Sequence, residues 1–429
     1  MTDTALDPVY ATVRRHVRAH AARLWDVSLA LHRRPEIAFQ EHRAAELLAG
    51  ELEAAGLGVE RGVAGMPTAF VARAEVGGRG GGGGGDAGGG GPRVALLLEY
   101  DALPGLGHAC GHNLIAAAGL GAGLAVRAAL AEGGGPGEGV PAGDAPVAPV
   151  QGGGTLMVVG TPAEERGGGK AIAAEAGLFD GVDAALMFHP GVHDWAWAPL
   201  TASALVRVGF HGRAAHPTGN PTEGIDALAA LIELFNTLSG LARRLPSGSH
   251  VQGVITDGGK AANIVPDYAE GLFGLRGATT AALEDLVAQL GSCADGIAHA
   301  TGATAETTRI GPRYQHFRDS PELSGRFTRH LARTGIQLTE PAPGTHLGSS
   351  DMGNVSTRVP AIHPFVAIMG PDGSHHTPEF AAAAAGPRAR EVMLAAAEAL
   401  ACTAADVLLT PAVRDTAWTR LREKAAAGQ

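Results

Sequence analysis

The sequence predicts an α/β protein: a mostly parallel, mixed β-sheet flanked by helices, with a second domain of ferredoxin-like α+β topology inserted into it. Two observations lead to this prediction. Short apolar segments with the composition of buried strands alternate with helix-forming segments in the first and last parts of the chain. Between these parts, the segments follow the order β-α-β-β-α-β of a ferredoxin-like unit. We therefore expect one domain formed by residues 1–200 and 312–429, and a second formed by residues 201–311.

The composition narrows the class of protein. A chain of 429 residues with 45% apolar residues is long enough for two domains with ordinary cores. A formal net charge of −10, without any Lys/Arg run, argues against nucleic-acid binding. There is no run of eighteen apolar residues and the N-terminus lacks the apolar core of a signal peptide, so we expect no membrane span and a cytoplasmic protein. Three widely spaced cysteines, Cys110, Cys293 and Cys402, do not form a disulfide framework, which also favours a reducing compartment.

The first part of the chain contains two predicted helices and two predicted strands. Apolar residues recur at helical spacing from about Pro8 to His32, and again from about Glu41 to Ala55. The alternating segment Ala69–Val76 and the apolar segment Val94–Tyr100 have strand character. Between these two segments, the sequence GGRGGGGGGDAGGGGP predicts a flexible insertion. A phosphate-binding loop is the alternative, but the GK[ST] sequence of such loops does not follow.

The alternation then continues. We expect a long helix after Asn113, a linker from about Glu132 to Gly154, and buried strands at Thr155–Gly160 and just before His189. In the inserted region we expect strands at about 203–212, 250–259, 269–277 and before 310, with helices at about 225–243 and 280–299. The sequence VPAIHPFVAIM then predicts another strand of the first domain, and a closing helix spans about residues 387–408.

The sequence HACGHN, residues 108–113, lies between a predicted strand and the long helix. Ligands and catalytic groups of α/β proteins gather at such junctions. The segment places Cys110 and His112 two residues apart, with the carboxylate of Asp101 shortly before them. Taken alone, these residues also fit a buried cysteine and two capping histidines.

Three further groups of metal-competent side chains follow predicted strands: Glu164 with Glu165, His189, and His375 with His376. Singly, each group fits an ordinary alternative, such as a solvated acidic pair or a polar loop. Jointly, thiolate, imidazole and carboxylate are the ligands of zinc, and mixed nitrogen and oxygen sets also suit manganese or cobalt. The pattern therefore predicts two metal ions for amide hydrolysis, with one of the adjacent glutamates as a ligand and the other as the base.

Seven motifs in order along the chain resemble those of a known family: EYDALPGLGHACGHN, TPAEERGGG, ALMFHPG, GRAAHP, GGKAANIVP, GSSDMGNVS and SHHTPEF. From about Leu31 to Phe380, the chain resembles the aminoacylase and carboxypeptidase-type metallopeptidases. It is most similar to their Cys-Gly-His amidohydrolase branch, and there to the p-aminobenzoyl-glutamate hydrolase and Xaa-Arg dipeptidase-like members. The resemblance implies an α/β domain of the zinc-exopeptidase type and an inserted domain that serves as lid and dimerisation domain.

The resemblance assigns roles in a metal centre. Glu164 matches the general base, which acts on a metal-activated water. Asp101 is a candidate for the acid that orients a ligand histidine. The implied cofactors are two divalent ions, zinc or manganese, with cobalt as a further candidate. The implied ligands are Cys110 as the bridge, His112, Glu165, His189 and His376.

Four other residues are assigned to the oxyanion or the substrate. His216 matches a histidine that reaches the partner subunit's active site and stabilises the tetrahedral oxyanion, which implies a homodimer. Asn263, Arg276 and His375 are expected at the substrate, Arg276 through a carboxylate. Each of two residues also has a structural alternative. His216 could cap the turn before Pro217, and Arg276 could be an exposed residue at a strand edge.

Two positions depart from much of the branch. Asn113 stands where an aspartate is usual, and Ser350 where a glutamate is usual. The acid that orients the ligand histidine is then Asp101, or is absent. Both departures resemble the p-aminobenzoyl-glutamate and dipeptidase members, and they favour a dipeptide or an aroyl-amino acid as the substrate.

The sequence thus predicts a metal-dependent amidohydrolase or dipeptidase that cleaves the amide bond of an N-acyl or N-aminoacyl amino acid. One alternative is a non-catalytic member of the same fold, or one that depends on a partner subunit, although the intact set of ligands and base argues against an inactive protein. Another is a cysteine hydrolase with Cys110 as nucleophile and a histidine base, which alkylation inactivates and chelators do not.

Overall fold

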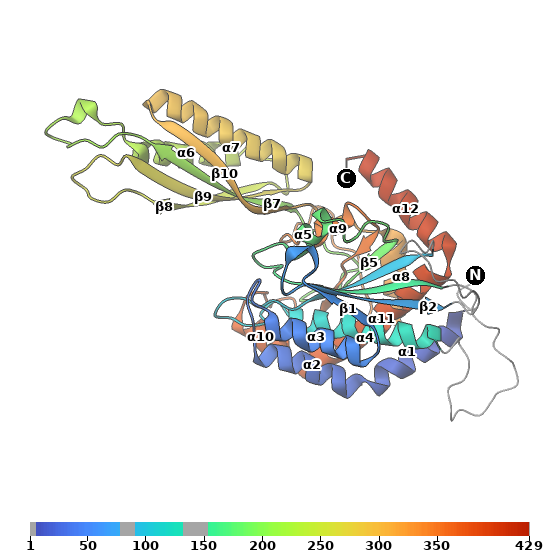
Figure 1. Ribbon diagram of the computed structural model, residues 1–429. Coiled ribbons are helices and arrows are strands. Elements are labelled where there is room, and N and C mark those ends of the chain that lie inside the picture. Colours follow the sequence, from blue (N-terminus) through green and yellow to red (C-terminus); the bar gives the residue numbers. More distant parts are fainter. Residues whose placement is uncertain (1–5, 78–90, 132–152, 429) are drawn as a thin grey trace, which may run out of the picture.

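The computed structural model describes residues 6–77, 91–131 and 153–428. The predicted glycine-rich insertion and the predicted linker after residue 131 lie almost wholly outside these residues. Within them, the chain forms a large α/β domain and a narrower domain that projects from it (Figure 1). The predicted fold class is confirmed.

The large domain is built on a six-stranded sheet with the order β1-β2-β4-β3-β5-β11. Strand β3 pairs in parallel with β4 and β5, and β5 with β11, whereas β2 is antiparallel to both β1 and β4. The sheet is therefore mixed and mostly parallel, as the alternation of strands and helices predicts. Its strands are β1 Gly58–Arg61, β2 Phe70–Gly77, β3 Arg93–Glu99, β4 Gly153–Thr161, β5 Ala184–Leu186 and β11 Ala361–Ile362.

Two hydrophobic cores lie on opposite faces of this sheet, and side chains alternate between them. Along β3, Val94, Leu96 and Leu98 join the larger core, whereas Ala95 and Leu97 join the smaller one. The helices of the larger core are α1 Asp7–Ala19, α2 Ala21–Arg33, α3 His42–Ala54, α4 His112–Ala131, α8 Pro321–Ala332, α10 Pro378–Ala383 and α11 Pro387–Leu409. The smaller core is covered by α5 Gly169–Glu175 and α9 Met352–Ser356, with α12 Pro411–Ala426 closing the chain.

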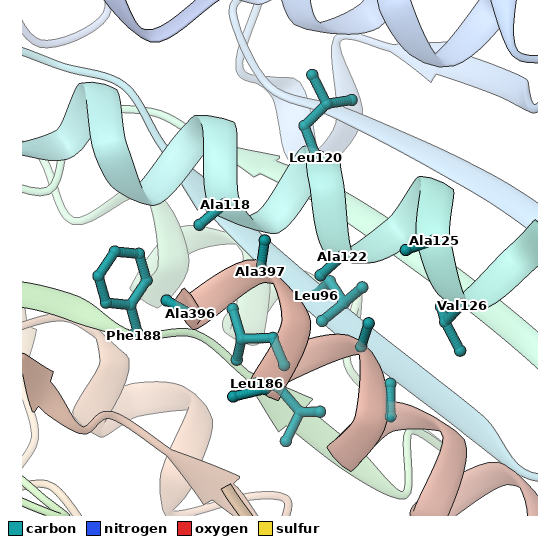
Figure 2. Packing of buried hydrophobic residues seen from close by; sticks show 14 of the residues in the cluster. Leu96, Ala118, Leu120, Ala122, Ala125, Val126, Leu186, Phe188, Ala396 and Ala397 are labelled. Atoms are coloured by element: carbon teal, nitrogen blue, oxygen red, sulfur yellow. The ribbon is translucent and has the colours of Figure 1, made fainter. Parts of the chain in front are cut away.

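Helices α4 and α11 pack against each other in the larger core. Small residues, among them Ala118 and Ala122 of α4 and Ala396 and Ala397 of α11, line their contact (Figure 2). By length and composition alone, both helices could cross a membrane. However, 78% of the apolar window of α4 and 94% of that of α11 are buried inside the protein, so core packing accounts for their composition.

The predicted helix Pro8–His32 is in fact two helices, which meet at His20. The apolar spacing did not reveal this break because Val17 and Leu24, on either side of it, face the same core. The sequence prediction also missed α8, which precedes the predicted closing helix, and α12, which follows it.

The strand predicted in VPAIHPFVAIM is interrupted at Pro364, which has no backbone N–H to donate. Residues before this proline form β11 of the large sheet. Residues after it form β12, Phe365–Ala367, which pairs in parallel with β6, His189–Gly191. This small second pairing brings the segment around residue 363 beside His189.

The projecting domain has the predicted ferredoxin-like order and a four-stranded antiparallel sheet, β10-β7-β9-β8. Helices α6 and α7 pack on one face of this sheet (Figure 1). Strand β8 is an edge strand, and it exposes Val254 and Ile255 at 58% and 47% of their surface. The elements are β7 Ala202–His211, α6 Ala227–Ala242, β8 His250–Asp257, β9 Tyr268–Gly277, α7 Thr280–Thr301 and β10 Thr304–Tyr314; short 3₁₀ turns lie at Val63–Gly65 and Pro221–Glu223.

Candidate metal centre

The candidate ligands meet where parallel strands of the large sheet end. The chain leaves β3 at Glu99 and returns at HACGHN to begin α4, and it leaves β4 at Thr161 just before the two adjacent glutamates. Because the carboxyl ends of parallel strands share one edge of the sheet, these segments lie together there. A cavity of about 1030 Å³ opens at this edge, and residues of both domains line it.

Two groups of possible metal ligands share one residue, Cys110. One group joins Cys110 with His112 and His189, and the other joins it with Glu165 and His376; within each group the ligand atoms lie within 4.8 Å of one another. Cys110 Sγ is 3.6 Å from His189 Nε2, and Glu165 Oε1 is 3.6 Å from His376 Nε2. Such an arrangement suits two cations bridged by a thiolate.

Asp101 orients His112 toward this centre. His112 Nδ1 lies 2.9 Å from the Asp101 carbonyl oxygen and 3.1 Å from its carboxylate Oδ1, so two acceptors hold the proton on Nδ1. The other nitrogen, Nε2, then faces the centre, 3.9 Å from Glu165 Oε1. Asp101 Oδ2 also accepts a hydrogen bond from the backbone N–H of Glu165 at 2.9 Å. One buried carboxylate therefore fixes a candidate ligand from each of the two groups.

The donor atoms fit a pair of divalent ions. His112 Nε2 and Glu165 Oε1 are buried and have no hydrogen-bond partner among the described residues. Buried polar atoms of this kind are costly unless something pairs with them. Imidazole, thiolate and carboxylate together form an ordinary ligand set for zinc, and the imidazole and carboxylate members also suit manganese.

His189 and His376 are also held with one ring nitrogen toward the centre. His189 Nδ1 lies 2.7 Å from the Pro190 carbonyl oxygen, which leaves Nε2 facing Cys110. The backbone of His376 has a φ of +62°, an uncommon conformation for a non-glycine residue, and its N–H donates to the Ala109 carbonyl oxygen at 2.9 Å. His375 instead places Nε2 3.1 Å from the Pro190 oxygen, so His376 is the one that meets Glu165.

The centre holds a surplus of negative charge. Burial raises the pKa of Glu164, and repulsion from Glu99 and Glu165 raises it further. Burial also raises the pKa of Glu165 and of the Cys110 thiol, the latter with added repulsion from Glu165. A buried thiol with a raised pKa is a poor nucleophile, which argues against the cysteine hydrolase alternative. Bound cations supply the attraction that ionises such ligands.

Three buried charges beneath the centre were missed by the sequence reasoning. The Lys170 Nζ lies 2.5 Å from Glu99 Oε1 and 2.6 Å from Asp351 Oδ1, and all three side chains are buried. Burial opposes protonation of Lys170, but attraction by Asp351 and Glu99 more than offsets it, so its pKa is raised. Glu99 Oε2 is 3.5 Å from His112 Nε2. Lys170 directly follows the motif TPAEERGGG, and Asp351 lies in the motif GSSDMGNVS. Because 181 residues separate them, their ion pair could not be predicted from the sequence.

Asn113, which departs from the branch pattern, has a packing role in this structure. Its Nδ2 donates to Ser28 Oγ at 2.9 Å and to the Ala384 carbonyl oxygen at 3.1 Å. It therefore links α4 to α2 and the segment after α10. The carboxylate next to His112 is that of Asp101, which was one of the two options left open by the sequence.

The projecting domain contributes Arg276, but not His216 or Asn263, to the cavity lining. Arg276 is on the inner strand β9, and its Nη1 donates to Ser349 Oγ at 2.9 Å, so it is not at an exposed strand edge. His216 is exposed, and its Nδ1 accepts from the backbone N–H groups of Thr218 and Gly219 at 3.2 and 3.0 Å. His216 therefore caps this turn, which is one of the two alternatives that the sequence allowed. The cap uses Nδ1 and not the other ring nitrogen.

Comparisons with known proteins find several relatives of this chain. Residues 201–301 match the family profile described as a peptidase dimerisation domain. The chain is 37% identical over 402 residues to the Xaa-Arg dipeptidase of Mus musculus, covering 92% of this chain and 87% of that protein. It is 31% identical to one of the subunits of p-aminobenzoyl-glutamate hydrolase from Escherichia coli, over 70% of this chain and 60% of that protein. A dinuclear metal binding peptidase of the M20 family from Bacillus subtilis shares the fold, with a TM-score of 0.63 at 21% identity over 89% of this chain and 99% of that one.

Proposed function

Because this chain belongs to the M20 peptidase family, whose members hydrolyse amide bonds, we propose that it is a metal-dependent dipeptidase that releases a basic amino acid such as arginine from the C-terminus of a dipeptide. The observation that carries the proposal is the pair of ligand groups that share Cys110 in a chain 37% identical to an Xaa-Arg dipeptidase. The lower similarity to p-aminobenzoyl-glutamate hydrolase makes an aroyl-amino acid the second candidate substrate, and an assembly with a different chain the second candidate arrangement.

Cys110 would bridge two divalent ions, zinc or manganese, with His112 and His189 on one and Glu165 and His376 on the other. When bound, such ions polarise the scissile carbonyl and lower the pKa of water. The protein's part is to hold the ligand atoms in place, and Asp101 does this for His112 and for the backbone of Glu165.

Glu164 is the proposed general base. It lines the cavity beside Glu165, and the hydroxyl of Tyr314 donates to its backbone carbonyl oxygen at 2.6 Å. Burial and repulsion from Glu99 and Glu165 raise its pKa above that of an ordinary carboxyl group, and a higher pKa favours acceptance of a proton from water. Glu164 therefore takes a proton from the attacking water and delivers it to the leaving amine.

Arg276 is the proposed partner of the substrate's carboxylate. It lines the cavity from the projecting domain, whereas the proposed ligands Cys110 and Glu165 line it from the large domain. Burial lowers the pKa of Arg276, which remains a cation. A guanidinium matches a carboxylate in geometry and charge. This contact would position the C-terminal residue of a dipeptide under the projecting domain.

We propose that the chain forms a homodimer through the projecting domain, which matches a peptidase dimerisation domain. The exposed edge of β8, with Val254 and Ile255, offers unpaired backbone groups and apolar surface to a second copy. His216 and Asn263 lie in loops that follow β7 and β8, outside the cavity of their own chain. We propose that these loops complete the active site of the partner. The unpaired state of all three cysteines fits the cytoplasm, which remains our proposed compartment.

The substrate proposal predicts chelator-sensitive release of arginine from dipeptides such as alanyl-arginine. A panel should also contain p-aminobenzoyl-glutamate, N-benzoyl amino acids and dipeptides that end in glutamate. Faster turnover of the arginine dipeptides, restored after chelation by zinc or manganese, is the expected result. Preferential turnover of p-aminobenzoyl-glutamate would instead favour the second candidate, and chelator-resistant turnover would contradict the metal mechanism.

Action of His216 in the partner's site predicts complementation between inactive chains. The variants His216→Ala and Glu164→Gln should each have little activity alone. Random exchange makes about half of the dimers mixed, and each mixed dimer has one intact site, so the mixture should regain about a quarter of wild-type turnover. A mixture that regains none, although mass spectrometry shows mixed dimers, would contradict the proposal. The matched control is His211→Ala, the same substitution at the end of β7. This variant alone should keep its activity, because His211 has no proposed role at the partner's site.

A further inference from the structure

One buried polar side chain in the cavity has no role in the mechanism above. Among the described side chains that line the cavity, only those of Glu165 and His363 have buried polar atoms without a hydrogen-bond partner. Glu165 is accounted for as a proposed metal ligand. His363 is 1% exposed, and neither of its ring nitrogens pairs with any group in the described part of the chain. The motif resemblance gave no signal for it.

Aromatic rings fix the imidazole of His363 beside the metal centre. Its ring lies 5.4 Å from that of His189, 5.6 Å from that of Phe365 and 5.8 Å from that of Phe317, each in an edge-to-face arrangement. The break at Pro364 between β11 and β12 places it there. Leu200 and Leu347 also line this cavity. His363 is thus a polar group in a largely apolar wall, which is how binding pockets fix the orientation of a ligand.

The chemistry of His363 suits a substrate group that donates a hydrogen bond. Both ring nitrogens of His363 are buried without a partner among the described residues, and a neutral imidazole keeps a lone pair on one nitrogen that accepts a hydrogen bond. A dipeptide bound through its carboxylate to Arg276 must also place its N-terminal ammonium somewhere. In a dipeptide of α-amino acids, that ammonium is attached to the carbon next to the scissile carbonyl. A side chain packed directly against the metal ligand His189 is within reach of such a group.

We propose that His363 accepts a hydrogen bond from the N-terminal amino group of the substrate and thereby selects dipeptides over N-acyl amino acids. The inference rests on the proposed dipeptidase function and names the residue that reads the other end of the substrate. A pocket built to pair with a polar group discriminates strongly against an analogue that lacks it, because the protein group is then left buried and unpaired.

The test compares alanyl-arginine with propionyl-arginine, which is the same molecule without its amino group. For the wild-type enzyme, the ratio of their kcat/KM values should favour alanyl-arginine by about 10- to 100-fold, the range for a hydrogen bond to a charged group. His363→Phe should bring this ratio close to one by slowing the dipeptide alone. His363→Gln, which keeps an acceptor, should retain part of the preference. Both compounds are measured on one preparation, so any loss of folded enzyme cancels in the ratio.

The matched control is His250→Phe, the same substitution at an exposed cavity residue of the projecting domain. It should leave the ratio unchanged. A wild-type ratio near one, or a His363→Phe ratio equal to that of the wild type, overturns the inference while the dipeptidase function stands. If the wild type hydrolyses neither compound, the proposed function fails. Calorimetric binding of both compounds to manganese-loaded Glu164→Gln protein, with and without His363→Phe, then decides the role of His363 separately.

Discussion

Replacing Glu164 with glutamine is expected to lower kcat by about 10²- to 10⁴-fold while two metal ions stay bound to each chain. The amide keeps the size of the side chain and cannot accept the proton of water. The two ligand groups that share Cys110 do not include Glu164, so the metals should remain. Measurement of kcat together with metal content by elemental analysis separates these two effects.

Glu165→Gln is the matched control for that variant. It makes the same chemical change one residue later, at a proposed ligand, and should lower metal content as well as turnover. A third group of ligand atoms joins Glu164 with His112 and Glu165, so the opposite assignment is a real alternative. Loss of one metal in Glu164→Gln, with both retained in Glu165→Gln, would reverse the roles of the two glutamates.

Replacing Cys110 with alanine is expected to reduce the bound metals from two per chain to one or none. Cys110 is the residue common to both ligand groups, so its loss weakens both positions at once. Loss of a group that merely orients a ligand costs about 10- to 100-fold in metal affinity, and loss of a bridging ligand should cost more. Isothermal titration calorimetry of the metal-free protein with zinc or manganese measures the number of bound ions and their affinity.

Cys293→Ala provides the control for a general effect of cysteine removal. Cys293 packs beside the core of the projecting domain, away from the ligand groups. Its replacement should leave metal content unchanged. If the Cys110→Ala protein binds two metals with wild-type affinity, Cys110 is not a ligand. If alkylation inactivates the wild-type enzyme and chelators do not, the cysteine hydrolase alternative is favoured.

The sequence was sufficient for most of the buried strands and for the residues that gather at their ends. Apolar runs such as Val94–Tyr100 mark buried strands, and polar residues directly after them fall at one edge of a parallel sheet. The placement of Cys110, His112 and His189 within 4.8 Å of one another agrees with that prediction. Asp101 likewise lies against His112, although the sequence had left the identity of this acid open.

The sequence was insufficient where long-range pairing or burial decides the outcome. Lys170 is a cation in a glycine-rich segment, and only the fold shows that Glu99 and Asp351 surround it. His363 lies in an apolar segment that was predicted as one strand, and its position in the cavity depends on the break at Pro364. Periodicity reports which face of an element is buried, but it does not report which distant side chains meet there.

We propose above that this chain hydrolyses a dipeptide with two divalent ions held around Cys110. The test is a titration of metal-free wild-type protein with manganese or zinc. Bound metal and the release of arginine from alanyl-arginine are measured at each step. We expect turnover to be absent without metal and to reach its maximum when two ions are bound per chain. Turnover by the metal-free protein, or full turnover with binding that saturates at one ion, would contradict it.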